Sequence, residues 1–263
     1  MKRLIRFCIN HIPRPVLQRF ASWSVPVAGL FYKGLRRSKG VACPVCGAHY
    51  RKFMPYGYVQ SRPNALCPSC LALERHRLLW LYLQRETDLL QSAPKTLHIA
   101  PEVSLMRPLR RHFAGRPERY VTADLESPLA DLHFDVQAIP LEADSFDVLI
   151  CNHLLEHVAD DRQALREFYR ILRPGGWGIL LSPVELDRAV TFEDDSITDP
   201  AERTRIFGQY DHRRIYGRDY AARLREAGFA VEEIDYAAQL GEAMRKRHAL
   251  PEDHIYVVRK PRP

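Results

Sequence analysis

Acidic residues are absent from the first 73 positions of this 263-residue chain. That stretch holds 12 of the 39 Lys and Arg, so the other 27 share the rest of the chain with all 32 Asp and Glu. A basic N-terminal region, residues 1–73, therefore precedes a mildly acidic remainder of the chain. Such a region attracts phosphate groups, either of nucleic acid or of an anionic membrane, although a solvated basic face is the plainer interpretation.

Long apolar runs are also absent. The first residues resemble a signal peptide, but Asn10, His11 and Pro13 interrupt the apolar stretch and no small-residue cleavage site follows. The next apolar run, residues 23–32, is too short to span a bilayer. We therefore predict no transmembrane segment and a cytoplasmic protein. Its basic, apolar N-terminal extension, residues 1–40, could lie peripherally on the inner face of the membrane, pack on its own protein or bind a partner protein.

Cysteine is too scarce for a disulfide scaffold, with six residues in the chain. Four of them form two C-x2-C pairs that are 20 residues apart: Cys43 with Cys46, and Cys67 with Cys70. This spacing is typical of a zinc ribbon, here residues 41–72, in which four thiolates surround the ion. Because no coordination position stays open, we expect a structural Zn2+ rather than a catalytic one. Iron is the alternative metal, and His49 and His76 are spare donors nearby.

The rest of the chain alternates apolar runs with amphipathic stretches. One helix is predicted over residues 73–90, within a linking region 73–93. The strands that follow are predicted at residues 96–100, 120–123, 134–136, 146–151, 177–181, 229–236 and 255–259. The helices between them are predicted at residues 102–113, from 154, at 161–172 and at 216–227. This alternation indicates an α/β fold with a largely parallel sheet, in which ligands bind beyond the carboxyl ends of the strands.

Two stretches carry a family resemblance. The first is P-L-E-A-D-S-F-D-V-L-I-C at residues 140–151, followed by L-E-H-V at 155–158, and the second is L-R-P-G-G at 172–176. On these motifs the chain resembles the class I S-adenosylmethionine-dependent methyltransferases of the type 11 group. The resemblance implies a Rossmann-like seven-stranded sheet with helices on both faces and an antiparallel last strand, over residues 94–263. With the ribbon in front, the chain is also similar to zinc-ribbon ribosomal-RNA guanine methyltransferases, although its N-terminal extension and substrate region do not match them.

The resemblance also implies where S-adenosylmethionine would bind. It places Asp124 and Leu125 at the ribose, Asp135 and Val136 at the adenine, and Asn152 and His153 near the methionine part. The first loop departs from the family, which has an acidic residue and then glycines there. This chain has His98 for the acid, and Ala100, Pro101 and Glu102 in the glycine region. Either Glu102 replaces the missing acid at the cofactor's amino group, or the loop no longer binds cofactor.

Residues 182–216 are too long for a simple connection and follow the carboxyl end of a strand, so we predict a substrate lid. In it, Asp211 and His212 could act as a base with its orienting acid, or His212 could pair with Glu193. The other interpretation is that these residues are charged side chains of the lid that face the solvent. His153 is the first candidate for the rim of the active site. Glu156 and His157 are interpreted as a helix start and a packing residue.

These features predict a methyltransferase whose acceptor is a small molecule, a membrane-linked glycan or lipid precursor, or RNA. The Asn-Pro-Pro-Tyr type of loop that acts on exocyclic amines is absent after the fourth strand, which argues against adenine-N6 or glutamine methylation. The alternative is a non-catalytic zinc-ribbon binding or scaffold protein. A dehydrogenase is disfavoured because no G-x-G-x-x-G follows the first strand.

Overall fold

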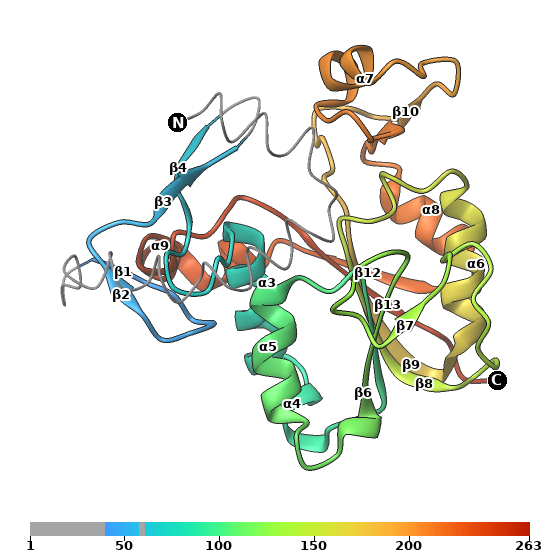
Figure 1. Ribbon diagram of the computed structural model, residues 1–263, viewed down its shortest axis with the longest axis horizontal. Coiled ribbons are helices and arrows are strands. Elements are labelled where there is room, and N and C mark those ends of the chain that lie inside the picture. Colours follow the sequence, from blue (N-terminus) through green and yellow to red (C-terminus); the bar gives the residue numbers. More distant parts are fainter. Residues whose placement is uncertain (1–39, 58–60) are drawn as a thin grey trace.

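The computed structural model describes residues 40–57 and 61–263, and Figure 1 shows their arrangement. The N-terminal extension, and with it the predicted contact with a membrane, lies outside the described residues apart from Gly40. Among the described residues, we find no helix with the length and apolar character that crossing a membrane requires.

A seven-stranded sheet forms the centre of the chain, with the strand order β12-β13-β9-β8-β5-β6-β7. The strands are β5 Thr96–Ile99, β6 Tyr120–Asp124, β7 Leu132–His133, β8 Phe146–Asn152, β9 Leu172–Leu181, β12 Ala230–Ile234 and β13 Ile255–Arg259. The strands β5 to β9 are parallel to one another, whereas β13 is antiparallel to both β9 and β12. The predicted fold class and its antiparallel last strand are therefore confirmed.

Helices cover both faces of this sheet, with α3, α4 and α5 on one side and α6 and α8 on the other (Figure 1). The helices are α3 Glu74–Arg85, α4 Leu89–Ser92, α5 Val103–His112, α6 Asp161–Ile171, α7 Pro200–Phe207, α8 Tyr220–Glu226 and α9 Tyr236–His248, with a 3-10 turn η2 at Pro117–Arg119. The double cover explains why central strands such as β8 are apolar along nearly their whole length. Along α6, Ala164, Leu165 and Phe168 share one buried face, as helical spacing requires.

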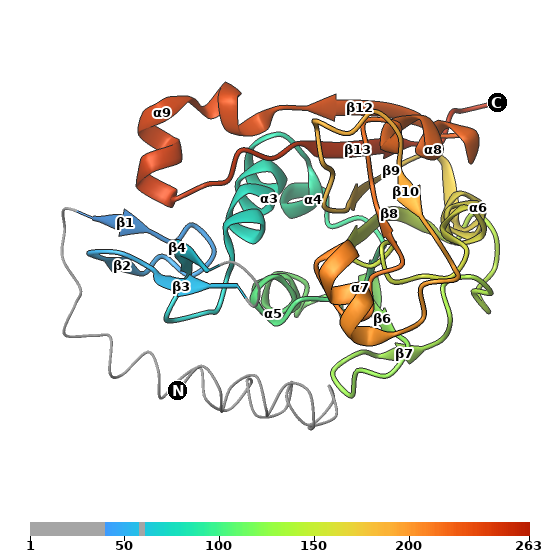
Figure 2. The same ribbon diagram turned by 90° about the horizontal axis from the view of Figure 1, so that it is seen from above.

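A small cysteine module precedes the sheet; we use this name for the described residues between 40 and 73. It contains two short antiparallel pairs, β1 Val41–Ala42 with β2 His49–Tyr50, and β3 Met54–Tyr56 with β4 Arg62–Leu66. Figure 2 shows α9 beside this module, and Nδ1 of His248 lies 2.7 Å from the carbonyl oxygen of Ala42.

Arg77 of α3 joins the module to the rest of the chain. Its side chain is fully buried and donates to the carbonyl oxygens of Ala65 and Ala72 in the module, at 2.7 and 2.9 Å. The same guanidinium donates to the carbonyl oxygens of His248 and Ala249 at the end of α9, at 2.7 and 2.6 Å. One side chain thus holds two distant parts of the sequence together.

The prediction of one continuous helix over residues 73–90 is wrong, because a non-helical stretch separates α3 from α4. Thr87 causes the break: its hydroxyl donates to the carbonyl oxygen of Leu83 at 2.7 Å and accepts from the amide of Leu89 at 3.3 Å. Hydroxyl side chains of this kind compete with the backbone for helical hydrogen bonds.

Two further expectations near the sheet are corrected. The third strand is β7, two residues earlier than predicted, because Asp135 instead closes a turn by accepting from the amide of Gln137 at 2.9 Å. Residues 154–157 form a turn rather than a helix, and the helix begins only after Asp160, whose carboxylate accepts from the amide of Gln163 at 2.8 Å.

The second half of the chain holds a helix that was not predicted. Helix α9 follows β12 directly, and its kink at Gly241 interrupts the apolar periodicity that would have revealed it. The 182–216 segment also has structure of its own, with α7 and the short pair β10 Phe192–Glu193 and β11 Arg214–Ile215. In Figure 1 this segment lies at the end of the sheet opposite the C-terminus, which is the end where the parallel strands finish.

Candidate cofactor pocket and metal centre

A cavity of about 530 Å³ lies at the carboxyl ends of β5, β6 and β8. Its wall is formed by the loops after these strands, by residues 134–137 and by one residue of the 182–216 segment: Ile99, Ala100, Ala123, Asp124, Leu125, Glu126, Ser127, Phe134, Asp135, Val136, Gln137, His153, Leu154, His157, Val158, Ala159 and Arg213. Six of the ten predicted cofactor residues are in this wall. The other four, His98, Pro101, Glu102 and Asn152, are not among the lining residues.

The backbone turns sharply at two points of the wall. Ala100 has a φ of 48° and His153 a φ of 51°, both in the left-handed region. The amide of Ala100 donates to the carbonyl oxygen of Ala123 at 2.8 Å, and that of His153 to Leu181 at 2.7 Å. Each turn costs roughly 1–2 kcal/mol for a residue other than glycine. The backbone at Ala100 therefore has a conformation that glycine adopts without strain, and its side chain is small.

Two carboxylates in the wall are oriented by their own loops. Asp124, the last residue of β6, accepts through Oδ1 from the amides of Glu126 and Ser127, at 2.9 and 2.8 Å. Asp135 accepts from both the amide and the side chain of Gln137, at 2.9 to 3.1 Å. Hydrogen bonds of this kind hold a carboxylate in one direction, which prepares it to bind a polar ligand.

Behind the first loop, Glu102 lies between two histidines. Its Oε1 is 3.3 Å from Nε2 of His76, and its Oε2 is 3.4 Å from Nε2 of His98 and 3.3 Å from Nδ2 of Asn152. Burial opposes ionisation of Glu102, but the two histidines outweigh it and hold the pKa of the carboxyl well below its usual range. His76 serves this cluster, with its Nδ1 next to the hydroxyl of Ser104 at 2.9 Å.

This cluster also contains buried polar atoms whose contacts fall short of hydrogen-bond geometry. Nε2 of His98, Oε1 of Glu102 and Oδ1 of Asn152 are buried and make no hydrogen bond of adequate geometry among the described residues. Such atoms are uncommon in native proteins and often mark a place where a ligand supplies the missing partner. Here they lie next to the loops that line the cavity.

The predicted catalytic residues of the 182–216 segment fall into two groups. Glu193 accepts from Arg214 and Arg223, both at 2.9 Å, so its contacts are arginines rather than His212. Arg214 also donates to the carbonyl oxygen of Leu155 at 2.6 Å. Glu193 thus belongs to a network that anchors the segment onto the turn after β8.

Asp211 and His212 both reach the turn after β8. Oδ2 of Asp211 lies 3.3 Å from Nδ1 of His157, and the ring of His212 packs edge-on against the ring of His157, with centroids 4.7 Å apart. The pKa of His212 is lowered, chiefly because the ring is buried and also because His157 lies nearby and its charge would repel a second one. The two residues therefore both contact His157.

His157, Arg213 and the buried Glu156 are the residues that the sequence interpretation missed as site candidates. Burial favours the neutral form of Glu156, but hydrogen bonding to His153 and the charges of His153 and His157 lower its pKa. The L-E-H-V motif at 155–158 was the available signal for two of these residues.

The family comparison agrees with this geometry. Residues 102–180 match the family model described as "Methyltransferase domain". This stretch of the chain is therefore similar to a methyltransferase domain. This match does not favour the non-catalytic alternative.

Known relatives resemble parts of the chain. It is 32% identical over 100 residues to an uncharacterized 37.1 kDa protein in transposon TN4556 of Streptomyces fradiae, covering 38% of this chain and 29% of that protein. It is 30% identical over 122 residues to 27-O-demethylrifamycin SV methyltransferase of Amycolatopsis mediterranei, covering 46% of this chain and 43% of that protein. The chain therefore spans less than half the length of these relatives. A solved S-adenosylmethionine dependent methyltransferase from Mesorhizobium loti is 15% identical with a TM-score of 0.47, covering 70% of this chain and 98% of that one.

The cysteine module in front of the methyltransferase domain brings its four thiols together. Sγ of Cys43 lies 3.6 Å from that of Cys70, and Sγ of Cys46 lies 3.8 Å from that of Cys67. A tetrahedron with Zn–S bonds of about 2.3 Å has edges of roughly 3.8 Å, so the quartet fits a zinc ion without rearrangement. All four sulfurs lie within 4.8 Å of one another.

The two knuckles of the module have the same backbone. Gly47 and Leu71 occupy equivalent positions with φ of 70° and 60°, and their amides donate to the carbonyl oxygens of Cys43 and Cys67, each at 2.9 Å. Cys151 lies outside the module in β8, where burial raises the pKa of its thiol well above the usual range. Cys151 is therefore an unreactive core residue.

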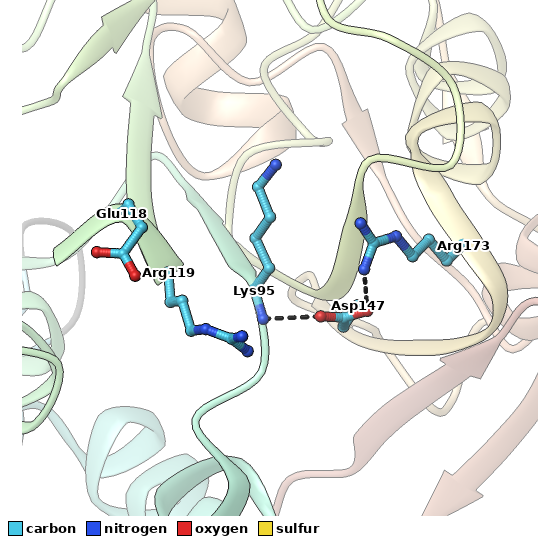
Figure 3. A pocket seen from close by; sticks show the side chains of 5 residues that line it. All are labelled: Lys95, Glu118, Arg119, Asp147 and Arg173. Atoms are coloured by element: carbon cyan, nitrogen blue, oxygen red, sulfur yellow. Dashed lines mark hydrogen bonds and ion pairs between the residues drawn. The ribbon is translucent and has the colours of Figure 1, made fainter. Parts of the chain in front are cut away.

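A second cavity of about 370 Å³ lies at the opposite, amino edge of the sheet (Figure 3). Its lining is entirely charged: Lys95, Glu118, Arg119, Asp147 and Arg173. Asp147 accepts from the amide of Lys95 at 2.9 Å and from Arg173 at 2.8 Å. Because Asp147 is already paired with Arg173, we assign no site to this cavity.

Proposed function

We propose that this protein transfers a methyl group from S-adenosylmethionine to an acceptor that enters beneath the 182–216 segment. The observation that carries the proposal is the cavity at the carboxyl edge of the sheet, most of whose lining residues fall within the matched residues 102–180. The proposal keeps the predicted division into a zinc ribbon at 41–72, a linker at 73–93, the domain at 94–263 and a lid at 182–216.

The residues present fit the cofactor. Asp124 would accept the ribose hydroxyls, and Asp135 with Val136 would hold the adenine. Leu125 is 62% exposed beside Asp124 and would cover the base or ribose. Oδ1 of Asn152 and Oε1 of Glu102, which make no hydrogen bond of adequate geometry, would receive the amino group of the methionine part, with His98 and Pro101 shaping the loop around it. S-adenosylmethionine, when bound, supplies the methyl group as an electrophile on a positively charged sulfur.

The protein's own residues would orient the two reactants. Methyl transfer depends chiefly on alignment of the acceptor atom with the methyl carbon. His153 and His157 both lie in the cavity wall, and His153 is placed to hold the acceptor or to receive its proton. Asp211, 3.3 Å from His157, would orient that ring.

The acceptor is proposed to be a small or lipid-linked molecule with apolar surface rather than RNA. Several large apolar side chains of the 182–216 segment are exposed: Leu186, Val190, Phe192 and Tyr210. Exposed apolar surface next to a site favours an apolar partner. For the cysteine quartet, we propose a structural Zn2+, in line with its sulfur–sulfur distances.

Calorimetric titration of the full, zinc-loaded chain with S-adenosylmethionine and with S-adenosylhomocysteine tests the cofactor proposal. We expect Asp124→Ala to weaken binding about 10- to 100-fold, because it removes charge-assisted hydrogen bonds. Asp147→Ala, at the amino edge, is the matched control and should bind as the unaltered protein does. Absence of binding to the unaltered chain would overturn the proposed function.

A further inference from the structure

Three side chains with metal-binding chemistry meet between the turn after β8 and the 182–216 segment. They are Glu156, His157 and His212, and one ligand atom from each lies within 4.8 Å of the other two. The methyl-transfer proposal assigns no role to Glu156 or His212.

Glu156 is the most informative member. The residue is 1% exposed, its Oε1 lies 3.3 Å from Nδ1 of His153, and its Oε2 makes no hydrogen bond among the described residues. A buried carboxylate oxygen without a partner is costly unless a positive group compensates it.

One ring nitrogen of each histidine lies within 4.8 Å of the other and of a carboxylate oxygen of Glu156. Nδ1 of His212 lies 3.1 Å from the carbonyl oxygen of Phe207, which can only accept, so Nδ1 carries the proton and Nε2 keeps its lone pair. Metal-binding histidines characteristically donate their other ring nitrogen to a carbonyl or carboxylate in this way. Nδ1 of His157 is buried and makes no hydrogen bond of adequate geometry, although Asp211 lies nearby.

We propose that Glu156, His157 and His212 bind one divalent first-row transition-metal cation, in the range from Mn2+ to Zn2+. Two imidazoles and one carboxylate form a ligand set that such cations accept, and Asp211 places a second carboxylate beside it. The cation supplies the positive charge that the buried Oε2 of Glu156 lacks. This site is separate from the cysteine quartet, whose soft thiolates differ from it in chemistry.

The position of the site gives it a consequence for the acceptor. His157 lines the cavity, so a coordination position left open by three protein ligands would face the space where the acceptor enters. The cation would then favour acceptors that offer an oxygen ligand, such as a hydroxyl or carboxylate. This consequence rests on the proposed function, whereas the binding of the cation does not.

Metal content after loading with two different cations tests the proposal. The full chain is first saturated with Zn2+ at the cysteine quartet, then equilibrated with Co2+, freed of unbound metal, and measured for zinc and cobalt. We expect one zinc and one cobalt per chain, with no sulfur-to-cobalt charge-transfer absorption. In His212→Ala and Glu156→Gln the cobalt should fall to a small fraction of one per chain, while the zinc stays at one.

The controls separate a lost ligand from a lost fold. His112→Ala removes an exposed histidine at the end of α5 and should retain the cobalt. Glu156→Gln keeps the shape of the buried side chain and is therefore expected to fold. If thermal unfolding shows that His212→Ala has not folded, the cobalt content of Glu156→Gln tests the proposal.

The outcomes also separate this proposal from the proposed function. An unaltered chain that binds zinc but no cobalt, or that holds cobalt only in thiolate coordination, would overturn the cation site, and so would folded variants that keep their cobalt. In that case a proton shared by Glu156 and His153 supplies the compensation. Cobalt binding without any S-adenosylhomocysteine binding would instead overturn the methyl-transfer proposal and leave the cation site standing.

Discussion

The cysteine module and the sheet that follows it are stabilised in different ways. The module has strands of two to five residues and a core of six buried residues, two of which are cysteines: Val41, Cys43, Tyr50, Phe53, Cys67 and Ala72. The sheet has strands of up to ten residues and a continuous core drawn from every layer. A core as small as that of the module cannot hold a fold by burial alone.

The difference explains where polar groups are placed. The module depends on specific polar bonds, namely its four thiols and the guanidinium of Arg77, so each of these must be satisfied. The sheet buries a much larger apolar core, which stabilises it without such bonds. It can therefore carry left-handed residues and unpartnered polar atoms at its carboxyl edge, where a ligand would use them.

Removal of the metal should separate the two regions most strongly. Structural zinc sites contribute on the order of 10 kcal/mol to folding. We expect Cys67→Ser, or chelation of the metal, to unfold residues 41–72. The central strands of the sheet should keep their protection against amide hydrogen exchange, which is the measurement. Cys151→Ala, which removes a buried thiol outside the quartet, should leave the protection of the module unchanged. Equal loss of protection in both regions under Cys67→Ser would show that they fold as one unit.

Replacement of Arg77 should weaken the joint between the regions. Arg77→Met leaves the carbonyl oxygens of Ala65, Ala72, His248 and Ala249 without their donor. We expect the free energy of unfolding to fall by about 3–5 kcal/mol in denaturant titrations, because several buried acceptors lose their partner. Arg62→Met breaks an exposed pair with Glu74 and should cost less than about 1 kcal/mol. Comparable costs for the two variants would contradict the role given to Arg77.

The cluster around Glu102 should make the sheet sensitive to acid. The pKa of Glu102 is held well below its ordinary value of 4.5 in the folded chain, so its stabilising contribution is complete above that value and is lost as the pH falls through the folded pKa. Glu102→Gln should therefore be less stable than the unaltered chain at neutral pH, by about 1–3 kcal/mol. The difference should shrink as the pH drops below the ordinary value.

Unfolding titrations at neutral and acidic pH measure this effect. Glu118→Gln, at an exposed position of the amino edge, is the matched control and should show no such convergence. A pH-independent difference for Glu102→Gln would mean that its charge does not matter to the fold.

The smallest expected effect concerns the left-handed turn at the cavity. Ala100→Gly should stabilise the chain by about 1 kcal/mol, which corresponds to a rise of roughly 2–4 °C in Tm, because glycine adopts a φ of 48° without strain. Ala93→Gly relieves a φ of 47° far from the cavity and should stabilise equally. S-adenosylhomocysteine affinity should respond only to Ala100→Gly. A lower Tm for that variant would show that the methyl group of Ala100 contributes packing that outweighs the strain.

The parts of the fold that depend on local pattern could be predicted. The strand at residues 255–259 was predicted within its observed bounds, because a run of buried apolar residues between polar ones is visible without any partner. The cysteine quartet was equally visible, since the chemistry of four thiols at that spacing has few other uses. Helix α9 was missed because Gly241 breaks its periodicity.

The contacts of the 182–216 segment could not be predicted. Glu193, Asp211 and His212 were named as candidates from their residue types alone, and their partners are more than twenty residues away in the sequence. The structure pairs Glu193 with Arg214 and Arg223, and brings Asp211 and His212 to His157. Residues 156–157 themselves were interpreted as helix start and packing, although the chain turns there without forming a helix.

The sequence by itself determined the α/β class, the order of the main strands, the cysteine quartet and the acids that follow the second and third strands. Each of these depends on residue type and spacing along a few turns of chain. Only the tertiary structure decided which side chains share a site: that Glu102 lies between His76 and His98, and that Glu156, His157 and His212 meet beneath the 182–216 segment. The reason is physical, because such encounters depend on how loops from separate strands fold back over the edge of the sheet, and no local pattern records that path.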